Sequence, residues 1–393
     1  MKVRLWKFSS VTAATLIALY AALAVAMQGL GFEVRDDELH FWPTSLSFSH
    51  TWFPSLELLK NYHELNTPLP FMIFGFLEKL MGGGIAVGRW ANYLLSLGLM
   101  LLLCWQARNR SVLWAALVGI LLFPYFLATS MLVYTDMLAL FCTILGIWSY
   151  QRRRPGLCAL SFILGLATRQ YVLAFPVALL LHELGKALQT QTWRERRPML
   201  LAQIAAVASL LPWFWLWGGF APPSEALRQG LMTEIEIRRL IPENSLYFLA
   251  ALGAYFVLPE RLLRLRETFY PPIKSWIFGL GIVMLMSLFW IFPPYGNLLD
   301  VPTMGFLDRV LRLFLSDTLR VAVFFGLATW AFWRFARPDF VGLLVLCNVL
   351  LMLKAKVAWD KYLLLLLVVL WWLHATESPC ASSTLNLNKS PKH

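Results

Sequence analysis

Long apolar runs separated by short polar segments dominate this chain. The first, residues 11–30, is long enough to cross a bilayer at about 1.5 Å of rise per residue. Similar runs predict membrane spans at residues 8–30, 87–106, 111–129, 132–150, 198–217, 244–258, 275–293, 318–336, 339–355 and 362–374. No polar stretch between them is long enough to fold around its own core. The pattern predicts one all-α domain over residues 1–375, a polytopic transmembrane helical bundle of about 10–12 spans.

One apolar stretch, residues 155–185, breaks this pattern because Thr168-Arg169-Gln170 interrupts it. Basic segments flank it on both sides, at residues 152–154 and 186–197, and such segments mark the cytoplasmic side of a membrane. We therefore expect two half-length helices that meet at Arg169 inside the membrane, packed against protein or lining a cavity. The alternative is a single tilted span, with the opposite topology beyond it.

Composition and charge support a membrane location. The chain is 59% apolar and only 14% charged, which excludes an ordinary soluble domain. Its net charge of +12 does not indicate nucleic acid, because the basic residues lie in short loops between spans. The basic residues within 2–7 predict an uncleaved signal-anchor and a cytoplasmic N-terminus. We expect a multi-pass protein of a bacterial plasma membrane, or of the endoplasmic reticulum in a eukaryote, with a disordered cytoplasmic tail at 376–393.

The loop after the first span, residues 31–84, contains Asp36-Asp37-Glu38 at the edge of the membrane. Three successive carboxylates there either form a solvated loop or do chemistry at the membrane surface. Thr67-Pro68 interrupts any helix, and the short apolar segment 71–80, ended by three glycines, predicts an interfacial or re-entrant helix. Amphipathic segments at 232–239 and 306–314 are also expected along the interface.

The unusual polar residues fall on the non-cytoplasmic side of this layout. They are Asp36, Asp37, Glu38, His40, Arg89, Tyr134, Asp136, Arg169, Lys354, Lys356, Asp360 and Lys361. The set combines carboxylates that can remove a proton with cations that can bind a phosphate. Glycosyl transfer from a lipid phosphate needs both, since a base deprotonates the acceptor hydroxyl while cations stabilise the departing phosphate.

At these residues the chain resembles a known family. The matching patches are Asp36-Asp37-Glu38 with His40, Thr67-Pro68, Arg89-Trp90-Ala91-Asn92, Phe123-Pro124 with Tyr134-Thr135-Asp136, Arg169-Gln170, and Trp359-Asp360-Lys361-Tyr362. In this order they resemble the GT-C superfamily of membrane glycosyltransferases. Within it they are most similar to the dolichyl-phosphate-glucose α-1,2-glucosyltransferases. Residues 180–350 show no resemblance beyond hydropathy.

The resemblance implies an inverting hexosyltransferase, with glucose favoured. It would use a polyprenyl- or dolichyl-phosphate sugar donor and a glycan or glycolipid acceptor on the non-cytoplasmic face. A carboxylate of the first loop would be the base, with Asp37 preferred, Asp36 second, and Glu38 beside them. The resemblance places substrate contacts at His40, Arg89, Tyr134, Asp136, Arg169, Gln170, Lys361 and Tyr362. Members of the superfamily differ in their need for a divalent cation, so the resemblance does not decide whether this chain binds a metal.

Simpler roles compete with several of these. Arg89 at the edge of a span can anchor to lipid headgroups, and Asp136 can cap the helix that begins there. His40 can be a packed loop residue. Arg169-Gln170 is followed in the family by Thr-Asn but here by Tyr171-Val172, so identical substrate contacts do not follow.

Two other classes of protein compete with the enzyme. A transporter or lipid flippase places polar residues near the bilayer midplane and has paired repeats, and the chain shows no such repeat. A structural subunit of a cell-envelope complex would not need the acidic loop or the intramembrane Arg169. The polar residues gather at one face, which favours the enzyme.

Overall fold

The computed structural model describes residues 6–228, 239–263, 265, 275–295, 297–298, 301–302, 305–355 and 357–376. Most of the expected amphipathic segment at 232–239, Lys356 and the tail beyond residue 376 lie outside these residues. The described chain is almost entirely helical, as the hydropathy pattern predicts. Its one ladder is an antiparallel pair of two-residue strands, β1 (Asn297–Leu298) and β2 (Val301–Pro302).

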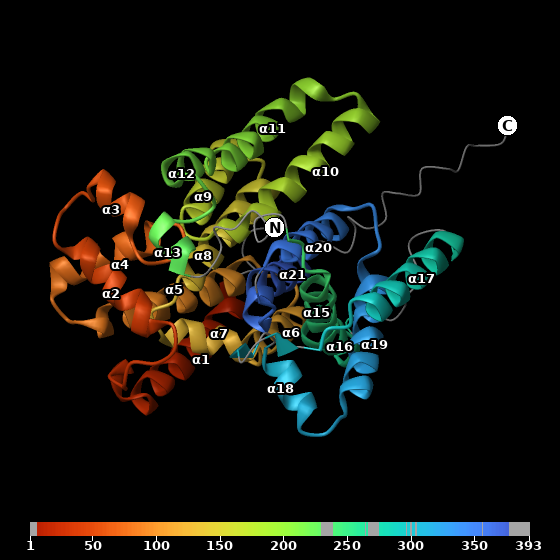
Figure 1. Ribbon diagram of the computed structural model, residues 1–393, viewed down its shortest axis with the longest axis horizontal. Coiled ribbons are helices and arrows are strands. Elements are labelled where there is room, and N and C mark those ends of the chain that lie inside the picture. The colour runs from red at the N-terminus through yellow and green to blue at the C-terminus, as the bar shows by residue number, and fades with distance from the viewer. Residues whose placement is uncertain are drawn as a thin grey trace.

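The helices of the first half, in chain order, are α1 (Trp6–Ala26), α2 (Glu38–Ser49), α3 (Leu56–Asn61), α4 (Leu69–Met81), α5 (Ile85–Gln106), α6 (Arg110–Leu121), α7 (Pro124–Met131), α8 (Asp136–Gln151), α9 (Pro155–Leu166), α10 (Ala174–Thr190) and α11 (Trp193–Ala208). Those of the second half are α12 (Leu211–Trp217), α13 (Pro223–Arg228), α15 (Pro242–Leu252), α16 (Leu258–Leu262), α17 (Ser275–Ile291), α18 (Phe306–Arg312), α19 (Asp317–Phe335), α20 (Phe340–Leu351) and α21 (Leu364–Thr376). In Figure 1, α2–α4 lie at one end of the long axis and α17 and α19 at the other.

Three described helical segments are long and apolar enough to cross a membrane: Ile85–Gln106, Gln170–Thr190 and Trp193–Trp217. The pair α6 and α7, bent by 68°, makes a fourth if it counts as one span. Shorter apolar helices cover four further segments: Val11–Ala26, Pro155–Leu166, Trp276–Ile291 and Phe340–Lys354. These lengths agree with a membrane protein, while the full number of spans and their sidedness stay predictions from the sequence.

The first loop folds into three helices, where the sequence predicts one. Helix α2 starts at Glu38, the last of the three acidic residues, and packs against α4, where a Cβ on Gly75 would lie 2.5 Å from the carbonyl oxygen of Ser45. Helix α4 begins after Pro68 and ends at Gly82, whose φ of +61° is a left-handed conformation that glycine adopts readily. The expected helix at 71–80 and its glycine end are therefore confirmed.

The break at Arg169 is also confirmed. Helix α9 ends at Leu166, a short 3-10 turn follows at Gln170–Leu173, and α10 continues from Ala174. Arg153, before α9, and Arg196, after α10, bind the same carboxylate of Glu183. The two flanking basic segments therefore lie at the same end of the hairpin, which a single tilted span would not allow. The second arm is longer than a half-length helix, because Gln170–Thr190 alone reaches spanning length.

Helix α21 forms the centre of the fold (Figure 1). Nearly every side chain from Leu364 to Thr376 is buried, and Trp371 and Trp372 are among the largest fully buried residues. A helix that is apolar on all faces is stable where other helices surround it. Because α21 is held on all sides, the 3-10 turn before it, Asp360–Leu363, presents Lys361 from a fixed position.

The π-helical segment Gly253–Val257, which continues α15, approaches α19 closely at Gly253, where a Cβ would lie 2.1 Å from the carbonyl oxygen of Leu327. We expect Gly253→Ala to lower the stability by about 1–3 kcal/mol, because the helices must separate to admit the methyl group. Gly326→Ala in α19 is the matched control, since a Cβ there meets nothing within 4 Å. Equal melting temperatures of the two variants in detergent would contradict this packing.

Candidate functional site

The acidic loop divides into two parts with different environments. Glu38 is completely buried and binds Arg89, which is also completely buried, through two hydrogen bonds of 2.9 and 2.6 Å. Arg89 also donates to the carbonyl oxygens of Leu30 and Phe32, and Glu38 accepts from the backbone N–H of Val133. This pair ties the loop to α5 and to the segment before Tyr134. Both side chains are completely buried in this pair, an arrangement suited to positioning the loop.

Asp37 faces the other way and binds Lys361. The Nζ atom of Lys361 donates to Oδ2 of Asp37 over 2.7 Å, and the Asp37 side chain keeps 29% of its surface exposed whereas Lys361 keeps 5%. Lys361 also lies 5.0 Å from the ring centre of Tyr134 and 4.8 Å from that of Trp359. Its charge is therefore held by one carboxylate and two aromatic faces.

Asp36 and His40, which the sequence also predicts for the site, are more exposed than Asp37. Asp36 has a φ of +51° and an exposed side chain, and His40 is exposed on the first turns of α2. Neither makes a side-chain contact to Lys361 in the described structure. Of the first-loop carboxylates, Asp37 alone is both partly accessible and paired with this lysine.

A second buried ion pair lies at the helix break. Nη1 of Arg169 donates to Oδ1 of Asp136 over 2.6 Å, and the hydroxyl of Tyr171 donates to the same oxygen over 2.7 Å. The second carboxylate oxygen of Asp136 and Nε of Arg169 are buried and have no hydrogen-bond partner within the described residues. Asp136 is also the first residue of α8, where the helix dipole favours its charge. The pair has spare polar capacity for a ligand.

Short sequence separations connect the two ion pairs. Tyr134 and Asp136 flank Thr135, and Lys361 is followed by Tyr362, whose ring centre lies 5.7 Å from that of Tyr171. The segments 36–38, 134–136, 169–171 and 360–362 therefore meet at one place. Gln170 turns away from them and donates to the carbonyl oxygen of Leu65 over 2.7 Å, which makes it a loop anchor.

Two residues near the site, Asp360 and Glu64, are given no role by the sequence analysis. Asp360, which is buried, accepts hydrogen bonds from the hydroxyls of Tyr247 and Tyr255 and from the backbone N–H of Leu307, and so fixes its neighbour Lys361. Glu64, in the loop between α3 and α4, is 7% exposed. Burial, together with the nearby charges of Glu225 and Asp37, raises the pKa of Glu64 to about 8. No sequence motif includes Glu64. The one sequence feature that could have indicated it is its position a few residues before Thr67-Pro68.

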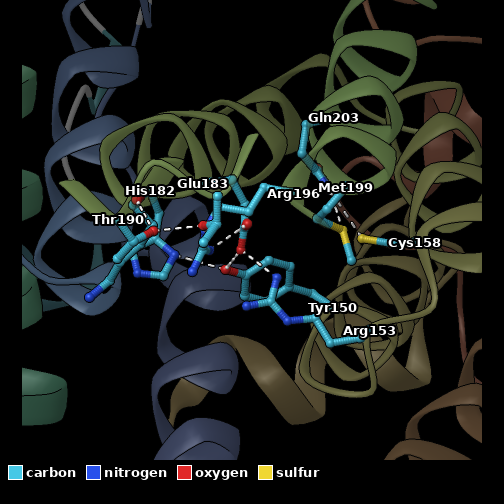
Figure 2. Close-up of polar contacts among 11 residues, drawn as sticks. Tyr150, Arg153, Cys158, His182, Glu183, Thr190, Arg196, Met199 and Gln203 are labelled. Atoms are coloured by element: carbon cyan, nitrogen blue, oxygen red, sulfur yellow. Dashed lines mark hydrogen bonds and ion pairs between the residues drawn. The ribbon is translucent and has the colours of Figure 1, made fainter. Parts of the chain in front are cut away.

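A different polar network is centred on Glu183 of α10, as Figure 2 shows. The buried carboxylate of Glu183 binds Arg153 over 2.7 Å and Arg196 over 2.8 Å, and it accepts a hydrogen bond from the Tyr150 hydroxyl. His182 contacts the same hydroxyl. Because three donors from different segments share the two oxygens of Glu183, the network is suited to fixing α8, α10 and α11 together.

The described residues contain no evident metal-binding site. They include no group of three or more His, Cys, Asp or Glu side chains that could hold an ion. The expectation about a divalent cation therefore stays open.

The chain was compared with protein-family models, with curated proteins and with solved structures, and nothing matches it.

Proposed function

We propose that this protein is a membrane glycosyltransferase that moves a hexose from a polyprenyl- or dolichyl-phosphate donor to a hydroxyl group of a glycan or glycolipid. The observation that carries the proposal is the partly exposed Asp37 carboxylate, 2.7 Å from Lys361 and surrounded by segments that also supply Arg169. A base for the acceptor and cations for the leaving phosphate are the two requirements of this reaction.

In the proposed reaction, Asp37 takes the proton of the acceptor hydroxyl as its oxygen attacks the anomeric carbon. The bond from that carbon to the phosphate oxygen breaks, and the lipid phosphate leaves with the electron pair. Lys361 and Arg169 stabilise its charge. In the absence of donor Lys361 neutralises Asp37, and a donor phosphate that competes for Lys361 frees the carboxylate to act as a base.

The proposal places this site on the non-cytoplasmic face of a bundle of about 10–12 spans. The basic residues Arg153 and Arg196 support this orientation, because they precede α9 and follow α10 and so lie at the end of the hairpin away from the break at Arg169. The N-terminus and the Arg153–Arg196 end would be cytoplasmic. The membrane would be the plasma membrane of a bacterium or the endoplasmic reticulum of a eukaryote.

The test is sugar transfer by the purified protein in lipid nanodiscs. Radiolabelled polyprenyl-phosphate glucose and, separately, the mannose donor are offered with a panel of glycolipid and oligosaccharide acceptors. Transfer or slow donor hydrolysis that disappears in Asp37→Asn would support the enzyme and identify the sugar. Absence of binding to every donor would refute the proposal and favour the transporter or flippase alternative.

Arg169 gives a separate prediction about donor binding. Because Arg169→Ala alone would leave Asp136 as an unpaired buried charge, the substitution is made in an Asp136→Asn background. We expect the dissociation constant for the donor to rise roughly 10- to 100-fold relative to Asp136→Asn alone. This change corresponds to the free energy of one hydrogen bond to a charged group. Arg153→Ala, which removes an arginine from the other end of α10, should leave donor binding unchanged. An unchanged constant in the Arg169 variant would exclude it as a phosphate ligand.

A further inference from the structure

Glu64 is a buried carboxyl group that the proposed reaction does not use. It lies in the loop between α3 and α4, is 7% exposed, and its Oε1 atom has no hydrogen-bond partner in the described part of the chain. An unpaired buried polar atom costs free energy, so its presence in a folded protein calls for a reason. One such reason is a ligand that supplies the missing hydrogen bond.

The loop around Glu64 is held firmly in place. The hydroxyl of Thr67 donates to the carbonyl oxygen of Leu166 over 2.7 Å, and Gln170 donates to that of Leu65 over 2.7 Å. The backbone N–H of Leu69 donates to Ala167. All of these contacts join the loop to the break between α9 and α10. Glu64 is therefore fixed relative to Arg169 by the same break that presents this arginine.

Charged groups from three other parts of the fold face Glu64. Asp37 precedes α2, Arg169 lies at the helix break, and Glu225 and Arg228 pair with each other on α13 over 2.6 Å. Glu225 and Asp37 oppose ionisation of Glu64, while the two arginines favour it. The phenol of Tyr62, two residues before Glu64, is buried and uncharged, and His63 beside it is exposed.

Burial is the largest of these influences and raises the pKa of Glu64 from 4.5 to about 8. The side chain is then mostly a carboxylic acid at neutral pH, with one O–H donor and a carbonyl acceptor. A neutral donor and acceptor pair matches a sugar hydroxyl, whereas a phosphate is better matched by Arg169 and Lys361 nearby.

We propose that Glu64, as a neutral carboxylic acid, is a sugar-binding residue that holds a hydroxyl group of the hexose donor or of the sugar acceptor next to Asp37. This inference rests on the proposed glycosyltransferase function and adds a specificity contact to it. A donor hexose or an acceptor sugar would supply the same hydroxyl chemistry, and binding measurements distinguish the two.

The experiment compares Glu64→Ala and Glu64→Gln in nanodiscs, with Glu57→Ala, an exposed glutamate on the preceding helix α3, as the control. The donor dissociation constant is measured without acceptor, and the acceptor KM is measured at saturating donor. We expect Glu64→Ala to raise one of the two constants roughly tenfold, because the hydroxyl loses its partner. Glu64→Gln should stay within a few-fold of the wild type, because an amide also offers a donor and an acceptor.

A pH series provides a second readout. Sugar binding by the wild type should weaken as pH rises through about 8, where Glu64 ionises, while the Glu64→Gln variant should not follow this change. The folded protein binds this proton more tightly than the unfolded chain. The stability of the wild type relative to Glu64→Gln should therefore be full below pH 4.5 and fall as the pH rises toward about 8.

The possible failures are distinguishable. If the wild type transfers sugar and Glu64→Ala leaves both constants unchanged, the sugar contact is refuted and the glycosyltransferase function stands. If Glu64→Gln loses kcat as strongly as Glu64→Ala, the group works by proton transfer, and the neutral-acid role is refuted. If the wild type binds no donor, the proposed function fails and the contact to a sugar fails with it.

Discussion

Replacing Asp37 by asparagine should lower kcat/KM for sugar transfer by roughly 10²- to 10⁴-fold, the usual contribution of a general base. The amide keeps the size of the side chain but cannot accept the proton of the acceptor hydroxyl. Donor affinity should be retained or rise slightly, because Lys361 loses the carboxylate that competes with the donor phosphate for its charge. Initial rates with a radiolabelled donor, measured beside donor binding, separate these two effects.

Asp36→Asn is the matched control for this prediction. Asp36 is the adjacent carboxylate and is exposed, with no side-chain contact to Lys361 in the described structure. We expect its substitution to leave at least a tenth of the activity. The reverse result, with Asp36→Asn inactive and Asp37→Asn active, would move the base to Asp36. Full activity of both variants would remove the acidic loop from the chemistry.

Replacing Arg89 by alanine should reduce the stability of the protein by about 3–5 kcal/mol, because Glu38 would be left as an unpaired charge in a fully buried site. The loss should appear as a lower melting temperature in detergent and as a lower yield of folded protein. Because the pair ties the acidic loop to α5, the remaining folded fraction should also lose activity. The paired change Glu38→Gln with Arg89→Met removes both charges and should recover much of the stability.

Arg153→Ala is the control for this second prediction. Arg153 is half-exposed, and its partner Glu183 keeps Arg196 and Tyr150 when Arg153 is removed. We expect a stability change of less than about 1 kcal/mol. A similarly small change for Arg89→Ala would mean that the Glu38–Arg89 pair does not hold the loop.

Local features of the chain predict much of the helical framework. The interruption at Thr168-Arg169-Gln170 and the basic segments on both sides of it predict the broken hairpin of α9 and α10, because hydropathy and loop charge act over short stretches of chain. The Thr67-Pro68 turn and the glycines at 82–84 likewise predict the limits of α4. Proline and glycine act on their own backbone, so their effect can be recognised without tertiary contacts.

The different environments of the three successive carboxylates, residues 36–38, are decided only by the tertiary structure. In the sequence Asp36, Asp37 and Glu38 are equivalent carboxylates at the edge of one span. The structure buries Glu38 against Arg89, 51 residues away, and pairs Asp37 with Lys361, 324 residues away. Coulomb energy depends on distance and on burial in space, neither of which is encoded by local periodicity.

Glu64 illustrates the same limit most clearly. Nothing in its neighbours along the chain distinguishes it from Glu57, which is exposed on the preceding helix α3. Its unusual state arises when the loop docks on the helix break and α13 brings Glu225 beside it. The sequence alone determined that the chain is a helical, membrane-type protein with its chemistry-bearing residues in a few short segments. The packing of those segments determined which side chains are paired, which are buried, and which remain exposed.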